Sequence, residues 1–144
     1  MPKNTLLFWA LFAAAIVADQ IVKEIILAGF RWESGCLSII LVYNDGVAFS
    51  MLSALGPWLK YLQTALIGGV VVYVFRAGLL NPYGPALGLL LGSGVSNVID
   101  RFVHGGVVDY IFWHCGFEFA VFNLADAVIN FSVALLIYLH FKKR

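Results

Sequence analysis

Charged side chains are scarce in this sequence. Asp, Glu, Lys and Arg make up 12% of its 144 residues, while 62% are hydrophobic. A soluble globular domain carries about 25% charged residues. The net charge of +1 leaves no basic footprint for binding nucleic acid. The composition therefore excludes a soluble domain and predicts an α-helical integral membrane protein with no nucleic-acid partner.

Histidine and cysteine are also few, and their positions exclude several kinds of site. The three histidines are scattered and form no His-Glu-x-x-His motif, so the sequence predicts no metal site and no cofactor. Gly92-Ser93-Gly94 lies in an apolar run without a nearby base, which argues against a serine nucleophile. The two cysteines, Cys36 and Cys115, can pair or remain free thiols, and two cysteines alone do not decide this.

Four long apolar runs cover most of the chain. Each supplies the roughly 20 residues that a membrane-spanning helix needs. We expect helices over residues 5–28, 57–75, 83–103 and 119–141, in one membrane domain over residues 1–144. The first run, behind Lys3, has the form of a secretory signal. Because Ile16 is bulky where a cleavage site needs a small residue, we expect this run to be retained as a span.

Acidic residues are absent from one side of the predicted bundle. Four spans place both termini on the same side, which also contains the 76–82 loop. That side carries five basic residues, Lys3, Arg76, Lys142, Lys143 and Arg144. All eight acids fall toward the opposite side. The positive-inside rule therefore predicts cytoplasmic termini and polar chemistry near the external face.

The two predicted external loops are rich in β-branched and aromatic residues. In the loop over residues 30–53, an apolar stretch over 36–43 precedes Asn44-Asp45-Gly46 and then residues 47–49. This pattern predicts a strand, a tight turn and a second strand. The loop over 104–121 has a similar composition. Because an isolated hairpin is marginally stable, we expect a small external β-sheet that packs on lipid, on the helices or on a third strand.

Two aspartates lie on either side of one short loop. Asp109 follows an apolar pair, and Asp126 lies where the last apolar run begins. A carboxylate in or beside hydrocarbon is costly and therefore suggests a function. Two adjacent carboxyls that share a proton can activate water and protonate a leaving amine, as peptide hydrolysis requires. Alternatively, Asp109 faces water from a strand, and Asn123 forms a helix capping box with Asp126.

Further polar residues are candidates for supporting such a pair. Asp19 and Lys23 share a helix face, so they form either an interfacial ion pair or a support for the site. Asn44 either closes a turn beside Gly46 or offers its amide to an extended peptide.

The third run ends in another polar group. Asn97 and Asp100 lie on one helix face, three residues apart. Arg101 either anchors the helix at the interface with Asp100 as its partner, or holds a carboxylate or a backbone carbonyl of a ligand. Gly92 and Gly94 just before them permit close helix packing.

With these residues in order, the chain resembles the lipoprotein signal peptidases (signal peptidase II), the membrane aspartyl peptidases of bacteria. The resemblance rests on five blocks: Asp19-Gln20-x-x-Lys23, Asn44-x-Gly46-x-Ala48-Phe49, Asn97-x-x-Asp100-Arg101, Val107-Val108-Asp109-Tyr110 and Phe122-Asn123-x-Ala125-Asp126-x-x-Ile129. Ser96 departs from the glycine that the family usually has there, although both residues are small.

The resemblance implies four transmembrane helices with an external β-cradle in the bacterial inner membrane. It implies cleavage of a prolipoprotein signal peptide just before a cysteine that carries diacylglycerol, with membrane lipid around a monomeric enzyme. Asp109 and Asp126 are the implied catalytic pair, and Asp100 is the rival for one of these roles. The implied support and substrate-contact residues are Asp19, Lys23, Asn44, Gly46, Asn97, Asp100, Arg101 and Asn123.

Two other classes of function compete with this hypothesis. A small proton- or ion-coupled transporter also uses intramembrane carboxylates, but here the acids cluster at one interface and do not line a path across the membrane. A non-catalytic lipid-binding protein with four spans leaves the paired aspartates and asparagines unexplained.

Overall fold

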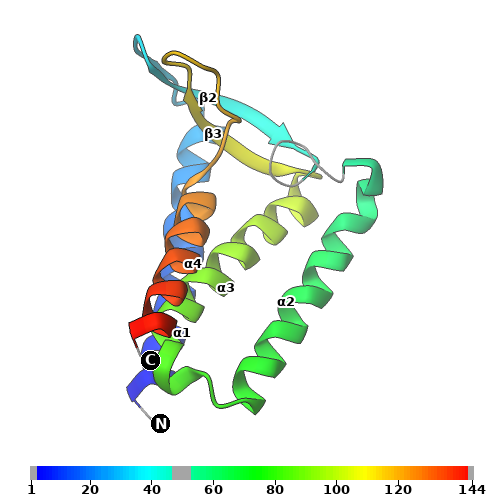
Figure 1. Cartoon of the computed structure of the whole chain (residues 1–144). Helices are drawn as coiled ribbons and strands as arrows, with labels where there is room; N and C mark the ends of the chain where they lie inside the picture. Colours follow the sequence, from blue (N-terminus) through cyan, green and yellow to red (C-terminus); the bar gives the residue numbers. More distant parts are fainter. Residues whose placement is uncertain (1–2, 47–52, 143–144) are drawn as a thin grey trace.

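Four helices stand side by side, and a small antiparallel sheet covers one end of them (Figure 1). The computed structural model describes residues 3–46 and 53–142. The helices are α1 (Lys3–Leu27), α2 (Leu59–Arg76), α3 (Leu80–Val103) and α4 (Leu124–Lys142). All four are long and apolar enough to cross a membrane, as the apolar runs predict. The beginning of α1 and the end of α4 lie at the end remote from the sheet.

All four helices begin at other residues than predicted, while their ends agree to within one residue; α1 begins at Lys3 rather than at 5. A short 3-10 helix, Ser53–Trp58, precedes α2 and contains Pro57, so α2 begins at Leu59 rather than at 57. Helix α3 begins at Leu80 rather than at 83. Helix α4 begins at 124 rather than at 119, because Phe122 is extended and forms a β-bridge with Ile111.

The sheet has three strands in the order β1-β2-β3. They are β1 (Trp32–Glu33), β2 (Leu37–Asn44) and β3 (Val107–Trp113). The β2–β3 register is interrupted between Ile39 and Val42, an irregularity of the β-bulge type. The predicted strand at 47–49 lies outside the described residues. The pairing of β2 with β3 places the first loop directly beside the strand that carries Asp109.

A disulfide, Cys36–Cys115, joins the two loops that carry the sheet. Cys36 lies just before β2, and Cys115 follows β3. The sequence left this pairing open, and the structure resolves it. The backbone N–H of His114 also donates to the carbonyl of Cys36 at 3.0 Å. The ends of β2 and β3 are therefore joined by a covalent bond as well as by hydrogen bonds.

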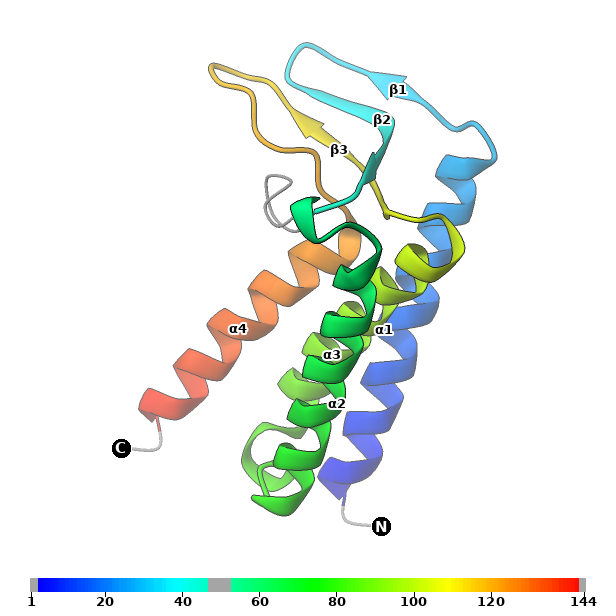
Figure 2. The ribbon, with the colours of Figure 1, turned by 90° about the vertical axis from the view of Figure 1, so that its right-hand side faces the viewer.

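Helix α3 lies at the centre of the bundle. In its most apolar window 56% of the residues are buried, compared with 11–17% in the other three helices. A Cβ added to Gly88 would clash with the carbonyl oxygen of Phe8, and one added to Gly92 would clash with that of Phe12. This spacing of small residues lets α1 and α3 pack backbone to backbone. Helix α2 packs chiefly on α3 and stands apart from α4 (Figure 2).

Candidate functional site

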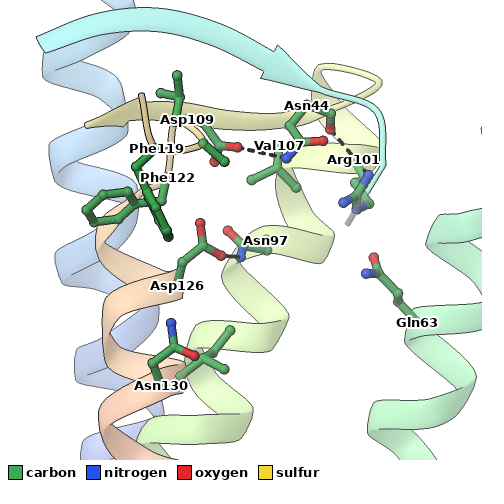
Figure 3. A pocket seen from close by; sticks show the side chains of 13 residues that line it. Asn44, Gln63, Asn97, Arg101, Val107, Asp109, Phe119, Phe122, Asp126 and Asn130 are labelled. Carbon is green, nitrogen blue, oxygen red and sulfur yellow. Dashed lines mark hydrogen bonds between the residues drawn. The ribbon is translucent and has the colours of Figure 1, made fainter. Parts of the chain in front are cut away.

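A cavity of about 470 Å³ lies beneath the sheet, between α2, α3 and α4. Both Asp109 and Asp126 line it, and their side chains point into it (Figure 3). The structure therefore brings together the two aspartates that the sequence singled out. The other lining residues are Asn44, Gln63, Asn97, Arg101, Val107, Phe119, Ala120, Val121, Phe122, Ile129 and Asn130.

Asp126 is oriented by the first turn of α4. Its backbone N–H donates to Asn123 Oδ1 at 2.8 Å, and the N–H of Asn123 donates to Asp126 Oδ2 at 3.1 Å. These reciprocal bonds form a capping box. The other carboxylate oxygen, Oδ1, accepts a bond from Asn97 Nδ2 at 3.0 Å. The capping interpretation and a role in the cavity are therefore compatible, since the cap itself aims the carboxylate.

Asp109 reaches the cavity from β3 and is 2% exposed. Its two oxygens accept hydrogen bonds from Asn44 Nδ2 at 2.9 Å and from Asn123 Nδ2 at 2.8 Å. Among the described residues, Asp109 and Asp126 form no ion pair. We call these two residues the cavity pair. Their carboxyls are held by neutral amides and backbone N–H groups, and no cation neutralises them directly.

The burial of Asp109 changes its acidity. Burial raises the pKa of this carboxyl from 3.8 to about 6, because a low-dielectric environment disfavours the charged form. The hydrogen bonds from Asn44 and Asn123 oppose the rise, and repulsion by Asp126 adds to it. Asp109 can therefore keep a proton at a pH where a solvated aspartate has lost it.

A second set of charged side chains lies behind the cavity. Lys23 Nζ is 2.6 Å from Asp19 Oδ2 and 2.6 Å from Asp100 Oδ2, and all three residues are 1% exposed. We call these three residues the ion cluster. None of them lines the cavity. The predicted Asp19–Lys23 pair is present, but it is fully buried rather than interfacial.

Asn97 connects the ion cluster to the cavity pair. Its Oδ1 accepts from Lys23 Nζ at 2.9 Å and from Asn123 Nδ2 at 3.1 Å. Since an ammonium group can only donate, Lys23 fixes which way the Asn97 amide points. The Asn97 NH₂ group is thereby directed at Asp126.

The ion cluster also fixes the backbone around the site. Asp19 Oδ1 accepts from the N–H of Ala125 at 2.9 Å, in the buried first turn of α4. Asp100 Oδ2 accepts from the N–H of Val108 at 3.0 Å, next to Asp109 on β3. Each carboxylate of the cluster therefore positions the segment that carries one member of the cavity pair.

Arg101 binds the end of β2 and the segment that follows it rather than Asp100. Its guanidinium donates to the carbonyl oxygens of Asn44, at 3.4 Å, and of Gly46. The N–H of Gly46 donates to Asn44 Oδ1 at 3.0 Å, which closes a turn. The interpretation of Asp100 as the partner of Arg101 is wrong, because Asp100 binds Lys23. Arg101 does hold backbone carbonyls, but they belong to this chain.

Several contributors to the site escaped the sequence analysis. The N–H of Leu124 donates to Tyr110 Oη at 3.0 Å, which ties β3 to the start of α4. Gln20 Nε2 donates to Asp100 Oδ1 at 2.8 Å. Gln63 and Asn130 line the cavity. A usable signal was present for the last two, because each is a polar residue inside an apolar run and Asn130 follows Asp126 by four positions.

The fold and the site define a multi-pass membrane protein with a pair of carboxyls in a cavity at one end of its helices. Within residues 3–46 and 53–142, no group of three or more His, Cys, Asp or Glu side chains is arranged to hold a metal ion.

Known proteins are similar to this chain in sequence and in fold. The family described as signal peptidase (SPase) II matches residues 11–142. The lipoprotein signal peptidase of Campylobacter jejuni is 53% identical over 139 residues, covering 95% of this chain and 89% of that protein. The lipoprotein signal peptidase of Wolinella succinogenes is 50% identical over 136 residues, covering 93% and 92%. A solved bacterial membrane enzyme superposes with a TM-score of 0.78 at 29% identity, covering 92% of this chain and 86% of its own.

The chain belongs to the signal peptidase II family and is a membrane peptidase. These similarities support the peptidase hypothesis and not the transporter alternative.

Proposed function

We propose that this protein is an aspartic endopeptidase of the bacterial inner membrane. It cleaves the signal peptide from diacylglyceryl-modified prolipoproteins immediately before the lipid-modified cysteine. The observation that carries the proposal is the cavity pair: Asp109 and Asp126 line one cavity at the end of the membrane helices, and neither forms an ion pair among the described residues.

In this proposal the cavity pair shares one proton. Asp109, with its pKa raised to about 6, carries the proton. Asp126 remains ionised and accepts N–H bonds on both oxygens. Two carboxyls in opposite protonation states are the arrangement that acid–base hydrolysis needs.

The reaction then proceeds in two steps. Asp126 takes a proton from a water molecule as the water oxygen attacks the scissile carbonyl carbon, and Asp109 gives its proton to the carbonyl oxygen. In the resulting gem-diol, one hydroxyl returns a proton to Asp109. Asp126 gives its proton to the nitrogen as the C–N bond breaks. The products are a signal peptide with a new carboxyl terminus and a lipoprotein with a free amino-terminal cysteine, and the pair returns to its starting state.

The remaining predicted site residues have supporting roles in this proposal. The ion cluster of Asp19, Lys23 and Asp100 holds β3 and α4 in place. Asn97 and Asn123 fix the two carboxyls. Asn44, Gly46 and Arg101 shape the loop beside the cavity, where an extended peptide would lie.

We further propose that both termini are cytoplasmic and that the cavity opens toward the external face. The basic residues at the ends remote from the sheet support this orientation. The disulfide between the two external loops supports it too, because such bonds persist in oxidising compartments. We expect a monomer whose substrate reaches the cavity within the membrane.

The direct test is cleavage of a diacylglyceryl-modified prolipoprotein by the purified protein in detergent, with mass spectrometry of both products. Wild type should cut once, before the modified cysteine. Asp126→Asn should lose at least about 10³-fold in turnover. A substrate that lacks the diacylglyceryl group serves as the matched control.

Folding is checked in the same samples by tryptophan fluorescence. A folded wild type that leaves the modified substrate uncut would refute the proposal, as would near-wild-type cleavage by Asp126→Asn.

A further inference from the structure

Two amide side chains inside the cavity have no role in the proposed chemistry. Gln63 projects from α2 and Asn130 from α4, and both line the cavity. Figure 3 shows them on opposite walls, with Asn130 farther from the sheet than Asp126. Gln63 makes no hydrogen bond among the described residues: its buried Oε1 is unpaired, and its NH₂ group points toward α3 and α4 (Figure 3). The side chain of Asn130 likewise has no hydrogen bond among the described residues.

Such residues are costly at this depth. Helices α2 and α4 are among the candidate spans and are predominantly apolar. An amide without a partner in an apolar environment costs on the order of 1–3 kcal/mol. Two NH₂ groups that face one cavity without an acceptor among the described residues suggest that a hydrogen-bond acceptor arrives with the ligand.

The position of Asn130 limits what that partner can be. Asn130 follows Asp126 by four residues, so it lies about one helical turn, or about 6 Å, farther from the sheet on the same face. The reacting peptide bond must lie at the level of the cavity pair. A group bound by Asn130 and Gln63 therefore extends from the level of the cavity pair toward the interior of the membrane.

We propose that Gln63 and Asn130 bind the ester carbonyls of the substrate's diacylglyceryl group. This inference rests on the proposed function. About eight bonds separate the nitrogen of the scissile bond from the nearer ester carbonyl oxygen, which is ample reach for one helical turn. An ester carbonyl only accepts hydrogen bonds, and each amide side chain supplies an NH₂ donor.

The peptide backbone fits this place less well. An extended peptide would lie beside Asn44 and β3, at the edge of the sheet, where backbone groups of the first loop already meet Arg101. Gln63 and Asn130 lie below that level, among Ile129 and the apolar wall of the cavity. Hydrogen bonds to the ester groups would hold the glycerol and leave the acyl chains in the apolar space beyond it.

The test compares two synthetic prolipoprotein peptides that differ only in the lipid linkage. One carries the natural diester, and the other carries a dialkyl diether, which lacks both carbonyls. The enzymes are wild type, Gln63→Leu, Asn130→Leu and the control Thr64→Val. Thr64 is the neighbour of Gln63 on α2, but it is exposed outside the cavity, and within the described residues its hydroxyl bonds only to the carbonyl of Lys60.

Each Leu variant should raise KM for the diester about fivefold, the effect of one neutral hydrogen bond, with kcat unchanged. Neither variant should change cleavage of the diether, and wild type should favour the diester over the diether. Thr64→Val should match wild type on both substrates.

Equal losses on both substrates would overturn the inference and assign the amides to the peptide or to the fold. No loss on either substrate would overturn it as well. Failure of wild type to cut either substrate would instead refute the proposed function, so the two failures are distinguishable.

Discussion

The ion cluster and the cavity pair belong to one polar network, but their carboxyls have different partners. In the ion cluster, Asp19 and Asp100 both contact the ammonium of Lys23 at 2.6 Å. In the cavity pair, Asp109 and Asp126 are held by asparagine amides and backbone N–H groups. A carboxylate with a cation partner has its charge neutralised and serves as structure. A carboxyl held only by neutral donors remains able to exchange a proton.

The two sets are nevertheless joined through a single side chain. Asn97 accepts from Lys23 and donates to Asp126. The ion cluster can therefore orient the cavity pair without neutralising it. The comparison predicts that damage to the cluster reduces stability, whereas damage to the pair abolishes activity.

The largest expected effect separates the two sets directly. Asp109→Asn should reduce turnover at least about 10³-fold, because an amide cannot give up the proton, with no loss of thermal stability, because the neutral amide replaces a carboxyl that is neutral in the proposed resting state. Asp100→Asn should instead lower thermal stability by about 1–3 kcal/mol, because a charge-assisted bond to Lys23 is lost. Both are measured on the same preparations, by cleavage at low temperature and by tryptophan fluorescence on heating.

The opposite outcome would reassign a role. A fully folded but inactive Asp100→Asn, beside an active Asp109→Asn, would move the second catalytic role to Asp100.

The next largest effect comes from removing the shared cation. Lys23→Met leaves Asp19 and Asp100 buried without a cation, and breaking a buried ion pair in this way costs about 3–5 kcal/mol. Thermal unfolding in detergent should show the loss. Lys142→Met, at the far and exposed end of α4, is the matched control and should unfold as wild type does. Equal stability of the two variants would mean that the cluster does not hold the fold together.

A smaller effect is expected from the disulfide. Cys36→Ser with Cys115→Ser should reduce stability by about 2–4 kcal/mol, because the ends of β2 and β3 lose their covalent link. Reductant should destabilise wild type by a similar amount. The double variant should not respond to reductant, and a response from it would show that the reductant acts elsewhere.

The smallest effect is a shift in pH dependence. Since the pKa of Asp109 is raised to about 6 in the folded protein, its proton contributes stability that is complete below pH 3.8 and is lost as pH rises through about 6. Activity that needs this proton should also fall as pH rises. The apparent pKa values of the pH profile then belong to the two carboxyls together. Asn44→Leu removes a hydrogen bond that lowers the pKa of Asp109, so the alkaline limb of kcat/KM should move to higher pH.

The conservative variant Asn44→Gln is the control, because it keeps an amide donor. Its alkaline limb should lie between those of wild type and Asn44→Leu. An alkaline limb that stays in place in Asn44→Leu would show that another group sets it.

Local patterns in the sequence predicted what depends on neighbouring residues. Apolar runs predicted the four helices, the i to i+4 spacing predicted the Asp19–Lys23 pair, and the spacing of Asn123 and Asp126 predicted the capping box. Each of these contacts lies within one helix or at its end, where periodicity determines the geometry.

Contacts between elements were beyond such patterns. The pairing of Lys23 with Asp100 depends on the register of α1 against α3, which the close approach at Gly88 and Gly92 helps to set. The start of α4 was predicted five residues early, because hydropathy cannot distinguish an apolar extended segment from the first turn of a helix. Phe122 is held extended by its bridge to Ile111 on β3, and that strand was placed beside it only by the fold.

The close contact between α1 and α3 makes the two sides of the bundle different within the plane of the membrane. Backbone touches backbone along that contact, so the two helices cannot slide or part without losing the contacts that position Lys23. Helix α2 has no comparable attachment to α4 (Figure 2). A lipid-linked substrate that diffuses in the bilayer therefore meets a closed wall from one direction and an adjustable one from the other. Its capture therefore depends on diffusion within the plane of the membrane to the side of the bundle where α2 and α4 stand apart.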